Sequence, residues 1–268
     1  MRAHPLKPIG ALVSEVSVRA LDRRQISWLR QQLAEHGVMI IRDQVVGDDD
    51  LMAFLRSFGE IRFTRGETPV PNCPDLNVIT NVGRDRPPRS TFHVDTTYVP
   101  MPPSYTALRA VVVPEYGGQT LFSNQYRAHD TLPDEVRRTL TGRVITHVAS
   151  GVDDDSSATH PVLRTHPVSG RTALYLTTPQ RCASISGLTT AESTAMVRYL
   201  FEHSTAQENV LRHTWSAGDV VMWDNRVVMH RAEHAGVVGD RIMHRGMAMD
   251  AGVGASTNGA GRGSGRVR

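Results

Sequence analysis

The sequence predicts a mainly β protein in which about eight short strands form a sandwich or jelly roll, with helices packed outside. Short runs rich in β-branched and aromatic residues are separated by Pro and Gly turn signals through most of the chain. These runs show no regular strand–helix–strand alternation, which argues against a doubly wound parallel sheet. The 268 residues and 40% hydrophobic content suit one large domain with its own core.

The first helix is expected over residues 21–36, where apolar residues recur at helical spacing. Asp22 stands near its start, and Gly37 stands where a C-terminal cap belongs. Residues 38–41 follow as a short apolar run, which favours a strand directly after the helix.

Two further helices carry end signals of their own. Residues 48–58 form an amphipathic pattern with an acidic first turn, closed by Gly59. Thr189 and Glu192 have the spacing of a capping box, which predicts a helix that runs to about His203.

The remaining elements are expected to be strands, because they are short apolar runs bounded by turn residues. We expect strands over residues 76–79, 105–113, 119–123, 143–147, 162–165, 173–176, 220–223 and 241–249.

The positive charge of the chain lies at its end. Residues 251–268 carry three arginines and no acid, so they account for the whole net charge of +3 and residues 1–250 are formally neutral. A nucleic-acid-binding domain would need a basic patch within the fold, so this distribution argues against one. The tail is rich in Gly, Ser and Ala and is expected to be disordered, which leaves 1–250 as the folded domain.

The chain is expected to be a cytoplasmic bacterial protein. No run approaches the ~18 consecutive apolar residues of a membrane span, and the N-terminus lacks the apolar region of a signal peptide. Cys73 and Cys182 have no partner at a zinc-ligand or redox spacing, so neither a disulfide framework nor a thiolate metal site is indicated. Lys7 is the only lysine, and this arginine bias favours a GC-rich genome over a special demand for anion binding.

His93 and Asp95 form the strongest chemical signal in the sequence. On a strand, side chains at positions i and i+2 share one face, so an imidazole and a carboxylate would point the same way. A histidine from a distant strand would complete a two-histidine, one-carboxylate triad, which binds Fe(II) and leaves positions open for other ligands. Alone the motif is weak, because about one His-x-Asp pair is expected by chance and a histidine bonded to a nearby aspartate is a common structural feature.

The surrounding sequence adds the missing context, because it resembles the taurine dioxygenase family of Fe(II)/2-oxoglutarate enzymes over roughly residues 5–250. That family includes the 2,4-dichlorophenoxyacetate and alkylsulfate dioxygenases. The resemblance implies a double-stranded β-helix (jelly roll) with flanking helices, and the cofactors Fe(II), 2-oxoglutarate and O₂. It is carried by the segments FHVDTTYVPMPPSY (92–105), PEYGGQTLFSN (114–124), HPVLRTHPVSGRTALY (160–175), AGDVVMWDNRVVMHRA (217–232) and DRIMHRGMAM (240–249).

Five positions match the family's metal and 2-oxoglutarate residues. His93 and Asp95 match the first two iron ligands, and His230 matches the distal one. Arg241, eleven residues after His230, matches the arginine that pairs with the distal carboxylate of 2-oxoglutarate, and Thr120 matches a hydroxyl bonded to the same carboxylate. A guanidinium fork with a hydroxyl is a suitable receptor for a carboxylate.

Arg245, fifteen residues after His230, matches an arginine that faces the substrate's anionic group in the taurine enzyme, so the resemblance implies an anionic substrate. If His234 were the distal ligand, the position at plus fifteen would be Met249, so only His230 satisfies both offsets. His244 alternates with the two arginines and is expected to point away from the site. Structural roles are also expected for His160, His166 and His213.

The substrate pocket departs from the pattern of the taurine enzyme. Thr64, Glu67 and Arg89 align with positions that contact the substrate there, but they are different residue types, so taurine is not expected to be the substrate. Glu67 and Arg89 could recognise a zwitterion, such as an amino acid or a natural-product intermediate, or they could be solvated loop charges.

The expected function is oxidation of a small anionic or zwitterionic organic substrate, most simply hydroxylation, with release of succinate and CO₂. Desaturation, cyclisation and oxidative cleavage of a sulfonate or sulfate ester are alternatives with the same cofactors. A catalytically silent metal-binding jelly-roll sensor would need the triad but not Thr120 and Arg241. The partner is expected to be a small molecule, with neither nucleic acid nor membrane, and homo-oligomerisation is left open.

Overall fold

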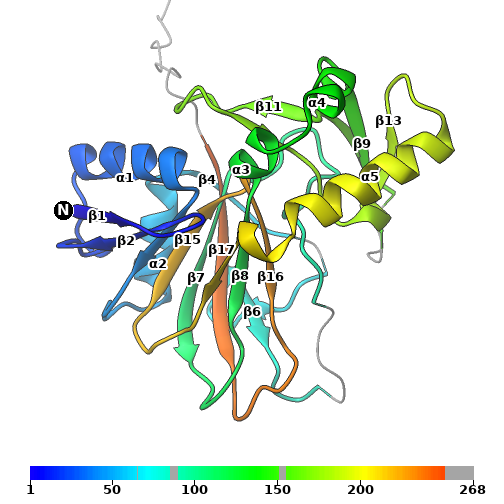
Figure 1. Cartoon of the computed structure of the whole chain (residues 1–268). Helices are drawn as coiled ribbons and strands as arrows, with labels where there is room; N and C mark the ends of the chain where they lie inside the picture. Colours follow the sequence, from blue (N-terminus) through cyan, green and yellow to red (C-terminus); the bar gives the residue numbers. More distant parts are fainter. Residues whose placement is uncertain (65, 85–89, 151–154, 251–268) are drawn as a thin grey trace, which may run out of the picture.

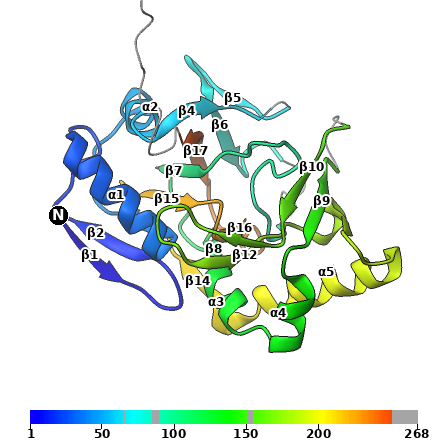
Figure 2. The same ribbon diagram turned by 90° about the horizontal axis from the view of Figure 1, so that it is seen from above.

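Two facing β-sheets form the centre of the molecule, and helices cover the outside (Figures 1 and 2). The structure is a computed structural model that describes residues 1–64, 66–84, 90–150 and 155–250. This arrangement confirms the mainly β jelly roll with flanking helices. Within the described ranges, every helix is too short or too polar to cross a bilayer. The tail 251–268, with its predicted disorder, lies outside the described residues.

The large sheet contains nine strands. They are β1 (Arg2–Pro5), β2 (Ala11–Ser14), β3 (Val38–Ile41), β4 (Gly59–Arg62), β5 (Pro69–Val70), β6 (Cys73–Thr80), β7 (Tyr105–Val112), β15 (Val220–Asp224) and β17 (Ile242–Asp250). Their order is β1-β2-β3-β15-β7-β17-β6-β5, with β4 paired to β17 outside this path. Only β2 and β3 are parallel among these pairs.

A three-stranded sheet faces the large one. It consists of β14 (Val210–His213), β8 (Thr120–Asn124) and β16 (Val228–Ala232), in the order β14-β8-β16. Two smaller ladders lie beside it, formed by β9 (Val144–Val148), β10 (Ser157–Pro161) and β13 (Cys182–Ile185), and by β11 (Leu163–Thr165) and β12 (Thr172–Leu174).

The helices lie outside these sheets. The α-helices are α1 (Arg23–His36), α2 (Asp48–Arg56), α3 (Gln125–Asp130), α4 (Asp134–Leu140) and α5 (Thr190–Ser204), and two 3₁₀ turns span Pro179–Arg181 and Gln207–Asn209.

Residues of β3 alternate between two separate cores. Val38 and Ile40 pack in the layer between the two sheets, while Met39 and Ile41 face the layer under α1 and α2, which also holds Leu33 of α1. Strand β15 alternates in the same way. A strand buried on both faces has no polar side, and this explains the continuous apolar run in the sequence.

The predicted helix ends are confirmed at α1 and α5. Asp22 accepts a hydrogen bond from the backbone of Gln25 in a capping box, and Gly37 ends the helix at φ 69°. Thr189 and Glu192 cap α5 in the same reciprocal way.

Some predicted bounds and counts were wrong. Helix α2 ends at Arg56, two residues before the predicted Phe58, because Phe58 turns into the core and Gly59 begins β4. All eight predicted strands are present, with ends shifted by at most three residues. The described residues form seventeen strands, however, so the expected number was too small, and α3 and α4 were not predicted.

Candidate active site

The segment that carries His93 and Asp95 joins the small sheet through a single bridge. The backbone N–H of His93 donates to the carbonyl of His230 (3.0 Å), and the N–H of His230 donates to the carbonyl of His93 (2.9 Å). The expectation of a regular strand here was wrong, because a turn begins at Asp95 and Thr96 has φ 50°. The bridge places the first and last residues of the predicted triad opposite each other.

The three predicted ligand side chains converge. The Nε2 atom of His93 lies 3.6 Å from Oδ1 of Asp95, and Nε2 of His230 lies 3.9 Å from Oδ2 of the same carboxylate. One ligand atom from each residue falls within 4.8 Å of the others. Atoms that each lie about 2.1 Å from one shared cation are separated by roughly 3–4 Å, so these residues can surround a single metal ion.

The protonation states suit metal binding. His93 Nδ1 lies 2.9 Å from the carbonyl of Thr91, so an N–H at Nδ1 leaves the lone pair of Nε2 facing the triad. Burial lowers the pKa of His230 to about 3, more than its attraction to Asp95 raises it. Burial opposes ionisation of Asp95, but His230 and Arg245 outweigh it and hold the pKa of that carboxyl well below its usual range.

A chain of hydrogen bonds fixes the carboxylate of Asp95 from behind. The hydroxyl of Thr106 donates to Oδ2 of Asp95 (2.7 Å) and accepts from Nδ2 of Asn225 (2.8 Å). Trp223 Nε1 in turn donates to the side-chain oxygen of Asn225 (3.0 Å). These three residues were not among the predicted site residues, although Trp223 and Asn225 lie in the MWDNR run.

Arg241 is a buried cation for which the described part of the chain supplies no anionic partner. Its side chain is 1% exposed, its Nε donates to the carbonyl of Gly118 (2.8 Å), and its Nη1 has no partner among the described residues. Burial lowers the pKa of Arg241 to about 10. A buried charge needs a counter-charge, so this guanidinium is suited to receive an anion.

Thr120 lies beside Arg241, as the sequence predicted. Its Oγ1 accepts hydrogen bonds from Nη2 of Arg241 (3.4 Å) and from Nε1 of Trp215 (3.0 Å). Because both contacts use the oxygen as acceptor, the hydroxyl hydrogen is free to donate to a bound carboxylate. Trp215 was not predicted, since a lone tryptophan carries no motif.

Gly118 allows the close approach of Arg241. It has φ 70°, and a Cβ atom there would lie 2.9 Å from Cδ of Arg241 and equally close to Pro114. The GGQT run therefore shapes the arginine pocket as well as supplying Thr120.

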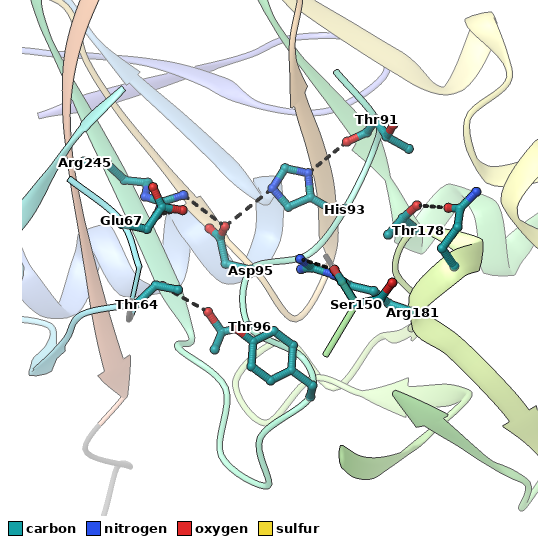
Figure 3. A pocket seen from close by; sticks show the side chains of 12 residues that line it. Thr64, Glu67, Thr91, His93, Asp95, Thr96, Ser150, Thr178, Arg181 and Arg245 are labelled. Atoms are coloured by element: carbon teal, nitrogen blue, oxygen red, sulfur yellow. Dashed lines mark hydrogen bonds and ion pairs between the residues drawn. The ribbon is translucent and has the colours of Figure 1, made fainter. Parts of the chain in front are cut away.

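Arg245 is already balanced by acids. Its Nη2 lies 3.3 Å from both Oε1 of Glu67 and Oδ1 of Asn77, and its Nη1 lies 3.5 Å from Oδ1 of Asp95 (Figure 3). Glu67 is thus an ion-pair partner and not a free loop charge. Thr64 lies nearby, with its hydroxyl 3.4 Å from that of Thr96, whereas Arg89 lies outside the described residues.

A pocket of about 500 Å³ opens beside the triad. Thr64, Glu67 and Arg245, which were predicted to contact the substrate, line it together with His93 and Asp95. Its other lining residues were not predicted. They are Thr91, Thr96, Tyr98, Ser150, Thr178, Gln180 and Arg181.

The four histidines that were expected to be structural each contact a polar group outside the triad. His244 points to α2, where Nδ1 lies 2.7 Å from Oδ1 of Asp48, so the expectation that it faces away from the site is confirmed. His160, His166 and His213 are buried and contact the carbonyl of Thr97, the carboxylate of Asp224 and the carboxylate of Asp219, respectively.

The chain is similar over nearly its whole length to known enzymes. It is 32% identical to the alpha-ketoglutarate-dependent 2,4-dichlorophenoxyacetate dioxygenase of Cupriavidus pinatubonensis, with 92% of this chain and 97% of the relative covered. A crystal structure of a taurine dioxygenase from Burkholderia xenovorans superposes with a TM-score of 0.83 at 30% identity, over 93% of this chain and 89% of that one. A structure of AAD-2 in complex with Mn(II) and N-oxalylglycine superposes with a TM-score of 0.81 at 27% identity, over 93% and 97%. A family model matches residues 2–247, and the chain belongs to the taurine catabolism dioxygenase TauD/TfdA family.

Proposed function

We propose that His93, Asp95 and His230 bind one ferrous ion, and that Arg241 and Thr120 bind the distal carboxylate of 2-oxoglutarate. As a member of its family the chain is an Fe(II)- and 2-oxoglutarate-dependent dioxygenase. The pocket beside the triad, lined in part by Thr64, Glu67 and Arg245, would take a small anionic or zwitterionic organic substrate.

The buried Nη1 of Arg241, which has no hydrogen-bond partner in the described residues, carries this proposal. A site that only holds a metal ion has no use for a fully buried arginine whose Nη1 lacks a partner in the described residues. A dicarboxylate that chelates the metal through its oxo acid end and reaches Arg241 with its other end satisfies both requirements. The same observation argues against a silent metal-binding sensor.

The residues of the site position the reactants. When bound, the iron and 2-oxoglutarate supply the oxidising chemistry, in which O₂ and the oxo acid yield succinate, CO₂ and an oxidised C–H position of the substrate. His93, Asp95 and His230 would hold the metal, and the pocket lined by His93 and Asp95 would give the substrate access to it. Arg241 and Thr120 orient the oxo acid by its far end.

Hydroxylation is the simplest outcome, because it needs no further group from the protein. Desaturation, ring closure in natural-product biosynthesis and oxidative cleavage of a sulfonate or sulfate ester require the same three ligands and the same arginine. The relative named for 2,4-dichlorophenoxyacetate acts on an organic anion, and this supports an anionic substrate here.

An anaerobic titration tests the proposal. Protein freed of metal is titrated with Fe(II) and then with 2-oxoglutarate, and a weak visible charge-transfer band is expected. His93→Ala should abolish the band, and Arg241→Ala should raise the 2-oxoglutarate concentration needed for it at least tenfold. His4→Ala, an exposed histidine far from the triad in sequence, serves as the matched control. A band that forms equally well in Arg241→Ala would contradict the assignment.

The proposal includes a cytoplasmic enzyme that acts alone on a small molecule, without nucleic acid or membrane. Residues 1–250 are formally neutral, and this supports the absence of a nucleic-acid partner. Homo-oligomerisation is compatible with every contact described above.

A further inference from the structure

The pocket beside the triad presents two guanidinium groups in different surroundings. Arg245 and Glu67 lie on one side of His93 and Asp95, and Arg181 lies on the other (Figure 3). Both arginines line the same pocket, so either could meet an anionic group of the substrate. What each guanidinium already contacts decides between them.

Arg245 has little capacity left for another anion. Nη1 faces Asp95, and Nη2 is shared between Glu67 and Asn77. Its Nε is buried without a partner in the described part of the chain, and so points away from the pocket. An anion arriving here would have to displace Glu67 or lie between two carboxylates, and like charges at such distances repel.

Arg181 is held by neutral groups. It ends the 3₁₀ turn Pro179–Arg181, and its Nε and Nη2 both donate to the carbonyl of Ser150 (3.2 and 3.1 Å). Its guanidinium lies over the ring of Tyr98, 5.5 Å from the centroid. These contacts hold the group in place, and no carboxylate of the described residues forms an ion pair with it.

With metal and 2-oxoglutarate bound, one positive charge of the site has no counter-charge. The divalent metal and Arg241 together balance the dianionic oxo acid and Asp95, while Glu67 balances Arg245. Arg181 is then the single uncompensated charge among the described lining residues of the pocket. A substrate with one anionic group would complete the balance.

We propose that Arg181 binds the anionic group of a monoanionic organic substrate, which is a carboxylate, a sulfonate or a sulfate ester. This inference rests on the proposed function. Glu67 determines specificity, because it forms an ion pair with Arg245 and so keeps the substrate's anion from that arginine. The anion is thereby kept away from the position next to the metal. Substrates whose anionic group adjoins the oxidised carbon are disfavoured, and substrates that hold it across the pocket are favoured.

Probe anions of graded length test this assignment. The anaerobic enzyme with Fe(II) and 2-oxoglutarate is titrated with phenylacetate, 3-phenylpropanoate, 4-phenylbutanoate and 5-phenylpentanoate, and with the neutral carboxamide of each. Binding is followed by the change in the visible band and by succinate released on admission of air. In the wild type, at least one longer carboxylate should bind at least tenfold more tightly than its carboxamide.

Variants at Arg181, at Glu67 and, for comparison, Arg245→Gln separate the two arginines. Arg181→Gln should weaken carboxylate binding at least tenfold and leave carboxamide binding unchanged, and Arg181→Lys should restore part of the loss. Glu67→Gln should strengthen phenylacetate binding at least tenfold, because it frees Arg245. Arg198→Gln on α5, where the arginine is 79% exposed and pairs with Glu202, is the matched control and should change nothing.

Several results would overturn the proposal. One is that Arg181→Gln binds the carboxylates as tightly as the wild type does. A second is that the preference for carboxylates is lost only in Arg245→Gln. A third is that the wild type forms the band but binds every carboxylate no more tightly than its carboxamide. Failure to form the band at all would instead refute the proposed function, and each variant's own band reports that it has folded.

Discussion

The hydroxyl of Thr106 donates to Oδ2 of Asp95 across 2.7 Å, and this bond links the candidate metal site to the large sheet. Thr106 lies on β7, near the centre of that sheet, within the buried first half of the strand. Asn225 Nδ2 donates to the same hydroxyl, which fixes the direction of its hydrogen.

Thr106→Val should therefore weaken metal binding. The change removes the donor to Asp95 and leaves Asn225 Nδ2 with only the carbonyl of Pro103 (3.2 Å). Loss of such a supporting contact typically costs about 10–100-fold in metal affinity. Calorimetric titration of the metal-free protein with Fe(II) under argon measures the change, with Thr106→Ser as the control that keeps the hydroxyl. If Thr106→Val and Thr106→Ser bind Fe(II) with equal affinity, the hydrogen bond from residue 106 does not orient Asp95.

Gly118→Ala should raise the dissociation constant for 2-oxoglutarate without altering that for Fe(II). A Cβ atom at this position would approach Cδ of Arg241 to 2.9 Å and push the guanidinium out of place. We expect an effect of roughly tenfold or more, since bidentate contacts to a carboxylate depend on geometry. Gly142→Ala is the matched control, because its φ of 73° is similar but nothing lies within 4 Å of the added atom. If both variants bind 2-oxoglutarate equally weakly, backbone strain and not the arginine pocket is responsible.

Local patterns predicted the helices that carry caps and the strands that contain an apolar run, and they missed strands in which polar residues interrupt that run. Strand β10 alternates buried and exposed positions with Thr, His and Pro, so its apolar signal is weak, and it was missed. Strand β16 was also missed, although it carries His230, because only its first half is apolar.

The residues proposed for the metal and for 2-oxoglutarate could be named from sequence because the segments that carry them resemble the taurine dioxygenase family, whereas the His-x-Asp spacing alone is a weak signal. Arg181 and Ser150 could not, since they come from segments without a motif and meet only through long-range packing. The same holds for the pairing of Glu67 with Arg245, which changes the role that sequence similarity implies for that arginine.

Removal of residues 251–268 should abolish retention on DNA-cellulose at low salt and leave succinate formation intact. The segment carries the entire net charge of +3, and binding to a phosphate backbone depends on such charge. Retention of full-length and shortened protein is compared at low and moderate salt. If the shortened protein still binds DNA, the basic surface belongs to the folded domain, and the expectation of an enzyme without a nucleic-acid partner fails.

Asp224→Asn should destabilise the fold strongly and in a pH-dependent way. Asp224 is fully buried, and its two oxygens accept hydrogen bonds from Nε and Nη2 of Arg226 (2.8 and 2.6 Å), with Nε2 of His166 3.0 Å from Oδ2. Burial alone would raise the pKa of Asp224, but Arg226 and the hydrogen bond of His166 outweigh it and hold that pKa far below its usual range. Neutralising one partner leaves the buried Arg226 with less compensation, and this costs about 3–5 kcal/mol.

The sign of the pH dependence follows from that lowered pKa. A carboxyl group with a depressed pKa in the folded state stabilises the fold fully above its unfolded pKa of about 3.9, and this contribution is lost as the pH falls towards the folded value. The difference in unfolding free energy between wild type and Asp224→Asn should therefore be constant from pH 7 down to about pH 5 and narrow below about pH 4. Urea unfolding across this range measures it. Asp134→Asn is the control, because Asp134 is 80% exposed, and its unfolding free energy should stay within about 0.5 kcal/mol of the wild-type value. If this variant loses as much stability as Asp224→Asn, the buried pair of Asp224 and Arg226 is not the cause.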